Sequence, residues 1–182
     1  MQVLQEQKPV RMTNSNNVIL TRSEGSRSKI MNNTHIAVQT EDFDLGTEYQ
    51  ALVEDNTQDG GVALFVGRVR EFNQEQQVTT LELEHYPAMT EKALRDIADQ
   101  ARQRWQINNL CIIHRVGKLE LSDQIVLVGV TSPHREAAFE SAQFLMDYLK
   151  TRAPFWKKET TTAGTQRWVE AQEKDQQAAK RW

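Results

Sequence analysis

Cationic side chains gather within residues 132–159, a segment with one long helical pattern followed by a basic stretch. His134 and Arg135 fall in the first turn of this pattern, where the helix macrodipole normally favours acidic side chains. Unpaired N–H groups beside a guanidinium and an imidazole can bind a phosphate or a carboxylate. The alternative is that both side chains extend into water, and these residues alone do not separate the two.

A second group of cations lies at the far end of the same segment. Lys150 and Arg152 fall in the last helical turn, where position alone also explains them, because cations stabilise the negative end of a helix. Lys157 and Lys158 directly follow two aromatic residues. Aromatic surface beside a lysine can desolvate the ammonium, which lowers its pKa and makes the amine available as a base or nucleophile.

The element that must position these groups is a helix that we expect to begin at Ser132 and to end before Pro154. Ser132 is a suitable N-cap, and Pro133 suits the first helical position because it has no N–H to leave unpaired. Small and apolar residues recur at helical spacing and predict the buried face: Ala138, Ala142, Leu145 and Leu149. Pro154 stops the helix, so the lysines after it are predicted to lie in a loop.

A predicted strand at residues 61–70 ends in a further basic pair. Its apolar run at 62–66 predicts a strand that is covered on both faces. Arg68 and Arg70 alternate and therefore point to one side of the strand end, while Gly67 allows a ligand or backbone to approach closely. A solvated strand end would account for the same residues.

The rest of the chain supplies the other predicted elements. Strands are expected at residues 36–39, 80–86, 110–116 and 124–131, and the last two are expected to pair as an antiparallel hairpin. Residues 71–78 form a predicted polar loop, and helices are expected at residues 45–53, 90–105 and 168–180. Strands that do not alternate regularly with about three main helices predict an α+β fold with a mainly antiparallel sheet.

Composition limits the classes of function. A chain of 182 residues is one domain, and its net charge of -3 gives no general attraction to nucleic acid or to an anionic membrane. The absence of a signal-peptide pattern and of a long apolar run predicts a cytoplasmic protein. The single cysteine, Cys111, is expected to be structural, and no histidine or cysteine falls at a recognised metal-ligand spacing. Neither a structural zinc nor a cofactor is predicted.

Residues 1–34 differ from the rest because Asn, Ser, Thr, Gln and Arg dominate them. Such a segment buries too little apolar surface to order itself, so we expect a flexible N-terminal extension before a domain at 35–182. Met31 is a candidate for the natural start of translation.

Four stretches of the chain resemble the large, catalytic subunit of molybdopterin synthase. The most specific is MDYLKTRAPFWKKE at 146–159, and the others are GRVR at 67–70, LEHYPAMTEKAL at 83–94 and DQQAAKRW at 175–182. The resemblance extends from about His35 to the C-terminus and keeps the family's order, which makes it more specific than one short motif. It implies the α/β-hammerhead arrangement and a homodimer.

The resemblance also implies an activity, that of a sulfurtransferase in molybdenum cofactor biosynthesis. The chain would accept the thiocarboxylated Gly-Gly tail of a small ubiquitin-like subunit, which makes a heterotetramer overall. Two such sulfurs would convert cyclic pyranopterin monophosphate into the dithiolene molybdopterin. Opening a cyclic phosphate requires cations that hold the phosphate and a group that transfers protons.

The same resemblance suggests roles for the residues singled out above. It assigns the reacting centre, as proton donor, base or transient acyl acceptor, to Lys150 and Lys157. Arg70, His134 and Arg135 are expected to hold the phosphate and pterin. Weaker candidates that orient or flank the substrate are Arg68, Lys158 and Glu159.

One helix cannot bring all these groups to one small substrate. His134 and Lys150 are sixteen positions apart, which is about 24 Å along a straight helix at ~1.5 Å per residue. If both belong to one site, His134 and Arg135 must come from a neighbouring subunit.

Two other interpretations remain open from the residues. The basic stretch could dock an acidic partner or nucleic acid without catalysis, although nucleic-acid binding favours a broader basic surface with exposed aromatic side chains. Alternatively, the chain could keep the fold and lack the activity.

Overall fold

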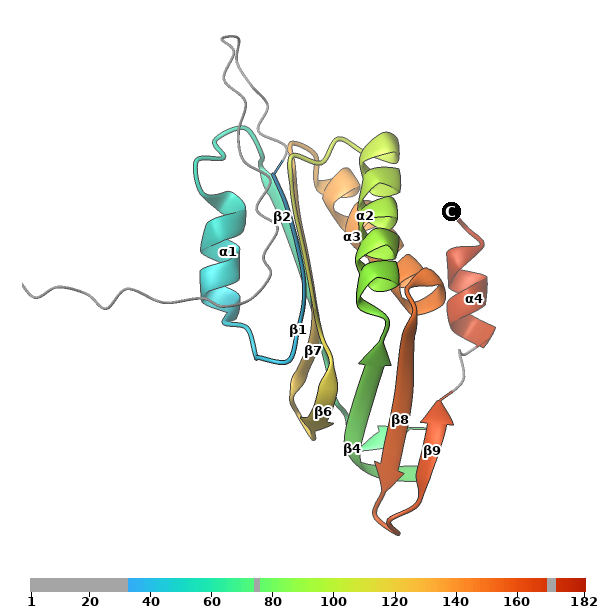
Figure 1. The fold of residues 1–182 in the computed structure, drawn as a ribbon. Coiled ribbons are helices and arrows are strands. Elements are labelled where there is room, and N and C mark those ends of the chain that lie inside the picture. The colour runs from blue at the N-terminus through green and yellow to red at the C-terminus, as the bar shows by residue number, and fades with distance from the viewer. Residues whose placement is uncertain (1–32, 74–75, 170–172) are drawn as a thin grey trace, which may run out of the picture.

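The computed structural model of this chain describes residues 33–73, 76–169 and 173–182. The predicted extension at 1–34 falls almost wholly outside these ranges, as does the suggested start at Met31. Strands and helices follow one another without regular alternation, and the predicted α+β class is confirmed (Figure 1). None of the described helices is long and apolar enough to cross a membrane.

Two sheets form the frame of the molecule. The first contains, in spatial order, β1 (Asn33–Gln39), β5 (Asn109–Arg115), β7 (Gln124–Ser132) and β2 (Gly61–Arg68). The second contains β3 (Phe72–Asn73), β4 (Gln76–His85), β8 (Phe155–Thr161) and β9 (Gln166–Val169), with β6 (Gly117–Glu120) paired to β4. The pairing of β1 with β5 is parallel, and the other described pairings are antiparallel.

Helices cover both faces of the first sheet (Figure 1). Helix α1 (Leu45–Val53) lies against one face, and α2 (Pro87–Arg104) and α3 (Arg135–Arg152) lie against the other. The short α4 (Glu173–Ala179) packs on α3. Side-chain alternation along β5 sends Leu110 and Ile112 into the large core under α2 and α3, and Cys111 and Ile113 into a smaller core under α1.

Helix α3 begins at Arg135, so the predicted start at Ser132 is wrong. The hydroxyl of Ser132 does accept a hydrogen bond from the N–H of His134, at 3.1 Å. However, Ser132 remains in β7, where it pairs with Gly61, and His134 becomes the N-cap. The strand ladder satisfies the backbone of Ser132 and therefore delays the helix. The predicted end holds, since α3 stops at Arg152, just before Pro154.

The stretch after Pro154 is strand β8, so the predicted loop is wrong. Residues 155–161 are rich in aromatic residues and Thr, which suit strands, and they pair along β4 from Val78 to His85. The predicted helix at 168–180 is also wrong in its first part, because β9 occupies Gln166–Val169 and α4 begins only at Glu173. The local sequence pattern could not reveal strand β8, because this strand forms by pairing with β4, which is distant in the sequence.

Of three further predictions, one is confirmed, one differs in its start and one is wrong. The hairpin pairing of β5 with β7 is confirmed, although β6 intervenes between them in the chain. Helix α2 begins at Pro87, three residues earlier than predicted, because proline fits the first helical turn. The predicted loop at 71–78 instead contains β3 and the first residues of β4.

Strand β2 lies at the edge of the first sheet, so the prediction that its apolar run is covered on both faces is wrong for the single chain. Val62 and Leu64 are 38% and 37% exposed, and Phe65 is 45% exposed. A run this apolar at an open sheet edge marks a surface that a further chain could cover.

Candidate functional site

A cavity of about 470 Å³ lies where the end of β2, the C-terminal end of α3, β8 and α4 meet. Its lining is basic, with five cationic side chains against two carboxylates: Arg68, Arg70, Lys150, Lys157 and Lys174, with Glu159 and Asp175. The chain as a whole carries a net charge of -3. Positive charge is therefore concentrated here, as a site for an anionic ligand requires.

Strand β8 positions the central lysine by its alternation. Phe155, Lys157 and Glu159 line the cavity, whereas Lys158 points to the opposite face. There Lys158 pairs with Glu82 at 2.6 Å and lies over the ring of Trp168. Lys158 therefore lies outside the cavity that Lys150 and Lys157 line.

Lys157 has the electrostatic character of a reactive amine. Burial lowers its pKa from the ordinary lysine value, and the positive charge of Lys150 lowers the pKa further. Asp175 and Glu159 act in the opposite direction, but their effect on the pKa is smaller. A lysine with a lowered pKa has a larger fraction of neutral amine near pH 7, which can act as a base or nucleophile.

Lys150 reaches the cavity from the last turn of α3 and is held by Asp175. The ammonium lies 3.2 Å from Asp175 Oδ1, and the lysine side chain is 42% exposed. Helix α4, which carries Asp175, is followed by Arg181 and Trp182, and both donate to Asp147 of α3. The C-terminus is thereby fastened beside the cavity.

A buried histidine, His114, forms part of the cavity floor. Its ring stacks on Phe155 with centroids 3.8 Å apart and planes 13° apart. Burial lowers the pKa of His114 to about 4, so the ring is neutral near pH 7. Nδ1 lies 2.8 Å from the carbonyl of Arg115, which can only accept, so Nδ1 carries the proton and Nε2 is an acceptor.

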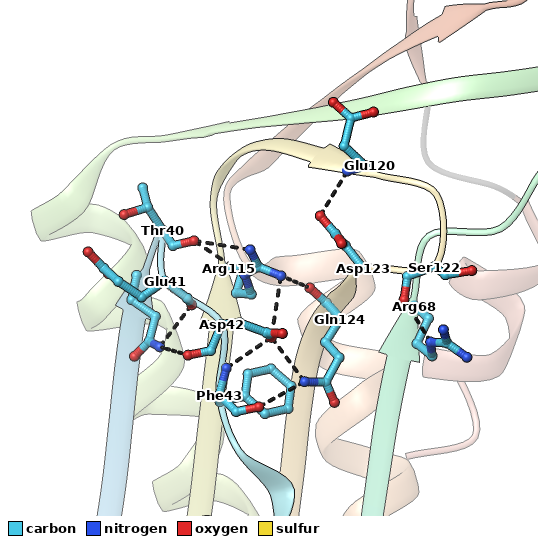
Figure 2. A network of polar contacts seen from close by, with 11 residues as sticks. Thr40, Glu41, Asp42, Phe43, Arg68, Arg115, Glu120, Ser122, Asp123 and Gln124 are labelled. Carbon is cyan, nitrogen blue, oxygen red and sulfur yellow. Dashed lines mark hydrogen bonds and ion pairs between the residues drawn. The ribbon is translucent and has the colours of Figure 1, made fainter.

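The two arginines at the end of β2 are held by the turn that follows β6. The side chain of Arg68 donates through Nε to the carbonyl of Ser122 at 2.8 Å (Figure 2). Val69 exchanges backbone hydrogen bonds with the same turn, donating to Asp123 and accepting from Ser122. Because the backbone is fixed on both sides of Arg68, Arg68 and Arg70 reach the cavity from a rigid support.

This turn is tied in its own place by Arg115, a residue that the sequence analysis did not single out. The nearly buried guanidinium donates to the carbonyls of Thr40 and Gln124 and to the carboxylate of Asp42 (Figure 2). Gln124 in turn donates to Asp42 at 2.9 Å. Arg115 therefore joins the β1–α1 connection to the strand that begins next to the Arg68 support.

Glu159 is buried and pairs with Arg167 of β9 at 3.1 Å. The charge of Glu159 also raises the pKa of Lys157, which moderates the effect of burial. This placement fits a residue that flanks the reacting groups.

His134 and Arg135 lie outside the cavity within one chain. Both are exposed at the opposite end of α3 from Lys150, close to Gly61 at the start of β2. The structure thus brings together Arg68, Arg70, Lys150, Lys157 and Glu159, and leaves His134, Arg135 and Lys158 apart from them.

Sequence reasoning missed Asp175, His114 and Arg115 as parts of this region. Asp175 begins one of the four stretches that carried the family resemblance, which was the one available signal for it. His114 and Arg115 lie in an apolar strand pattern, where their burial against the cavity and the turn depends on tertiary contacts.

Comparisons with known proteins identify the family of the chain. The family model described as "MoaE protein" matches residues 38–152. The molybdopterin synthase catalytic subunit of Escherichia coli is 57% identical over 152 residues, which is 84% of this chain and all of that protein.

Solved structures extend the likeness to the fold. A molybdopterin biosynthesis MoaE protein from Burkholderia ambifaria is 52% identical and matches with a TM-score of 0.70, over 82% of this chain and 97% of that one. The complex of subunits 1 and 2 of molybdopterin-converting factor from Helicobacter pylori shares the fold at 20% identity, with a TM-score of 0.59 over 77% and 90% of the two chains. The family match covers more than half of the described domain, and this chain therefore belongs to the MoaE protein family.

Proposed function

We propose that this chain acts as the catalytic subunit of a molybdopterin synthase. Its reaction is the transfer of two sulfurs to cyclic pyranopterin monophosphate, which gives the dithiolene of molybdopterin. The observation that supports this most directly is the half-buried Lys157, with a lowered pKa, in a cavity lined by four further cations. A family member that had lost its activity would have no need to keep a desolvated lysine among like charges.

The phosphate of the substrate accounts for the basic lining. A cyclic phosphate diester bears one negative charge, and the monoester formed when the ring opens bears up to two. Arginines bind phosphate oxygens with planar, paired donors. Arg68 and Arg70 stand on a rigid strand end beside the lysines, which suits them to hold the phosphate while the pterin reacts. Neutral His114 can accept a hydrogen bond through Nε2 without adding charge.

Sulfur must come to the cavity on a partner. The chain has one cysteine, and burial raises the pKa of Cys111 to about 12, so it is a poor sulfur carrier. We infer that a small ubiquitin-like subunit presents a thiocarboxylated Gly-Gly tail. Its sulfur forms a bond to a substrate carbon as a C–O bond at that carbon breaks, and the oxygen leaves as water or on the phosphate of the opened ring. Water then cleaves the resulting thioester, which frees the tail as a carboxylate and leaves the sulfur on the pterin. Two tails are consumed per product.

Lys150 and Lys157 are proposed to serve these steps as proton donor, base or transient acyl acceptor. Lys157 has the lowered pKa, which favours the role of base or acceptor. Lys150 forms an ion pair with Asp175, which suits it to the role of a charged donor that holds anionic oxygens.

A homodimer would complete the site. Gly61 and Arg68 lie at opposite ends of β2, about 23 Å apart at ~3.3 Å per residue, and His134 and Arg135 adjoin the Gly61 end. If two exposed β2 edges meet antiparallel about a two-fold axis, the start of one strand lies beside the end of the other. His134 and Arg135 of one protomer then approach the cavity of its partner, and two small subunits make the assembly a heterotetramer.

The reaction is proposed to take place in the cytoplasm. A chain with a single cysteine cannot form an internal disulfide, which is consistent with a reducing compartment.

The experiment that tests the function is a single-turnover assay. It combines purified chain, thiocarboxylated small subunit and cyclic pyranopterin monophosphate, and measures dithiolene formation. We expect Lys157→Ala to lower the rate at least about 100-fold, since acid–base groups contribute roughly 10²–10⁴. Lys92→Ala, which removes an exposed lysine of α2, is the matched control. The proposal is rejected if the unmodified chain binds neither the small subunit nor the pyranopterin precursor.

A further inference from the structure

Three side chains of metal-binding types converge on the face of the first sheet that α1 covers. They are His35 of β1, Glu48 of α1 and Cys111 of β5. One ligand atom of each, an imidazole nitrogen, a carboxylate oxygen and the thiol sulfur, lies within 4.8 Å of the other two. None of these residues lines the cavity described above.

The fold explains why residues so distant in sequence meet. His35 and Cys111 are directly paired in the parallel register of β1 and β5, so their side chains stand next to each other on the same face. That face carries α1, as Figure 1 shows, and Glu48 lies in the first turn of this helix. Asp44 fixes the start of the helix by accepting from the N–H of Thr47 at 2.8 Å. Three separate elements therefore supply one ligand each.

The burial of the three side chains forms a gradient from solvent to core. His35 is exposed, Glu48 is intermediate and Cys111 is 3% exposed. His35 therefore marks the side of the group that is open to solvent.

We propose that His35, Glu48 and Cys111 form a binding site for Zn²⁺ that joins β1, α1 and β5. A thiolate and an imidazole select zinc over Mg²⁺ and Ca²⁺, which prefer oxygen ligands alone. Ligand distances of ~2.0–2.3 Å place the ligand atoms of a tetrahedral zinc about 3.5 Å apart. The three atoms need to move inward by about 1 Å, and the exposed His35 and the intermediate Glu48 have room to do so. Three protein ligands leave the fourth position for water.

The ion would act on the stability of the fold. It would link β1, the first strand of the described residues, to helix α1 and to the neighbouring strand β5. Binding to the folded state alone stabilises it by RT ln(1 + [Zn²⁺]/Kd), so the melting temperature should rise with zinc concentration. None of the three residues lines the cavity, so the proposed reaction does not use this site.

The test is titration of the full chain, purified without an affinity tag, with Co²⁺ as a spectroscopic substitute for zinc. The chain contains one cysteine, so a thiolate-to-cobalt charge-transfer band can come only from Cys111. We expect the band to saturate at one ion per chain and to be lost on addition of Zn²⁺. His35→Gln and Cys111→Ala should each remove the band, and neither variant should show the zinc-dependent rise in melting temperature.

The controls separate metal binding from misfolding. His35 is exposed, so His35→Gln keeps the core even if Cys111→Ala loosens it. Glu54→Gln removes a negative charge at an exposed position just after α1 and should leave the band unchanged. A titration of the unmodified chain without the thiolate band, or a band that persists in His35→Gln, would overturn the proposal.

Discussion

The Lys150 ammonium lies 3.2 Å from the carboxylate of Asp175, a contact that joins the last turn of α3 to the last helix of the chain. Asp175 also raises the pKa of Lys157, whereas Lys150 lowers it. The two partners of this ion pair therefore act on the same neighbouring amine with opposite sign, and each can be removed separately.

Replacement of Asp175 should make Lys157 easier to deprotonate. Asp175→Asn removes a negative charge that favours the ammonium and leaves the charge of Lys150 without this partner. Both effects lower the pKa of Lys157. We expect acetylation of Lys157 by an amine-specific reagent, followed by mass spectrometry, to begin at lower pH than in the unmodified chain. An unchanged or higher pH of half-reaction would contradict the assignment.

Replacement of Lys150 should have the opposite effect on the same measurement. Lys150→Gln removes a positive charge that disfavours the Lys157 ammonium, so the pKa of Lys157 rises towards the ordinary value. The pH of half-acetylation should shift upwards. Labelling is the suitable measurement because Lys150 is itself a proposed catalytic group and its loss would obscure an activity profile. Lys118→Gln, which replaces an exposed lysine of β6, is the matched control and should leave the pH of half-acetylation of Lys157 unchanged.

Neutral His114 should make the folded state sensitive to acid. Its pKa of about 4 in the folded chain lies below the ~6.5 of an unfolded histidine, so the unfolded state binds the proton first as the pH falls. The associated stability is complete above about pH 6.5 and is lost towards pH 4, with a size of roughly 3 kcal/mol. Urea unfolding should show that the free energy of unfolding falls more steeply with decreasing pH in the unmodified chain than in His114→Gln.

The control for this experiment is His134→Gln, which removes an exposed histidine at the N-cap of α3. It should keep the steep loss of stability below pH 6.5. If the free energy of unfolding depends equally on pH in the unmodified chain and in His114→Gln, then the His114 ring stacked on Phe155 is not the titrating group.

The sequence predicted the features that local pattern specifies, namely the end of α3 before Pro154 and the fold class. It also singled out Lys150 and Lys157 as cations that flank Pro154, and both line the cavity, while their catalytic roles stay a prediction from the family resemblance. The strand at 155–161 was missed because its cause is the pairing with β4, a partner some seventy positions away in the chain. The start of α3 was wrong because the ladder with Gly61 competes with capping by Ser132.

Contacts between distant segments were not predicted from the sequence for the same reason. Asp175 meets Lys150 only after the C-terminal segment folds back on α3, and Arg115 gains its partners only when residues 40–43 pass beside β7. The grouping of His35 with Cys111 depends on the parallel register of β1 and β5, which spacing along the chain does not reveal.

The separation of His134 from Lys157 within one chain gives a test of the shared site. His134→Ala and Lys157→Ala should each be inactive as pure homodimers in the single-turnover assay. In mixed dimers, the cavity of the His134→Ala chain keeps its own Lys157 and receives His134 from its partner. Random pairing of equal amounts makes half of the dimers mixed, and each mixed dimer has one intact site, so about a quarter of full activity should return.

The matched control is a mixture of Lys150→Ala with Lys157→Ala. Both lysines line the cavity of the same chain, so each site in a mixed dimer lacks one of them and no activity should return. Recovery in the first mixture alone shows that His134 acts across the interface. Recovery in both mixtures would indicate that the lysines can also be supplied across the interface. Recovery in neither, with mixed dimers demonstrated by mass, would reject the sharing of one site between two chains.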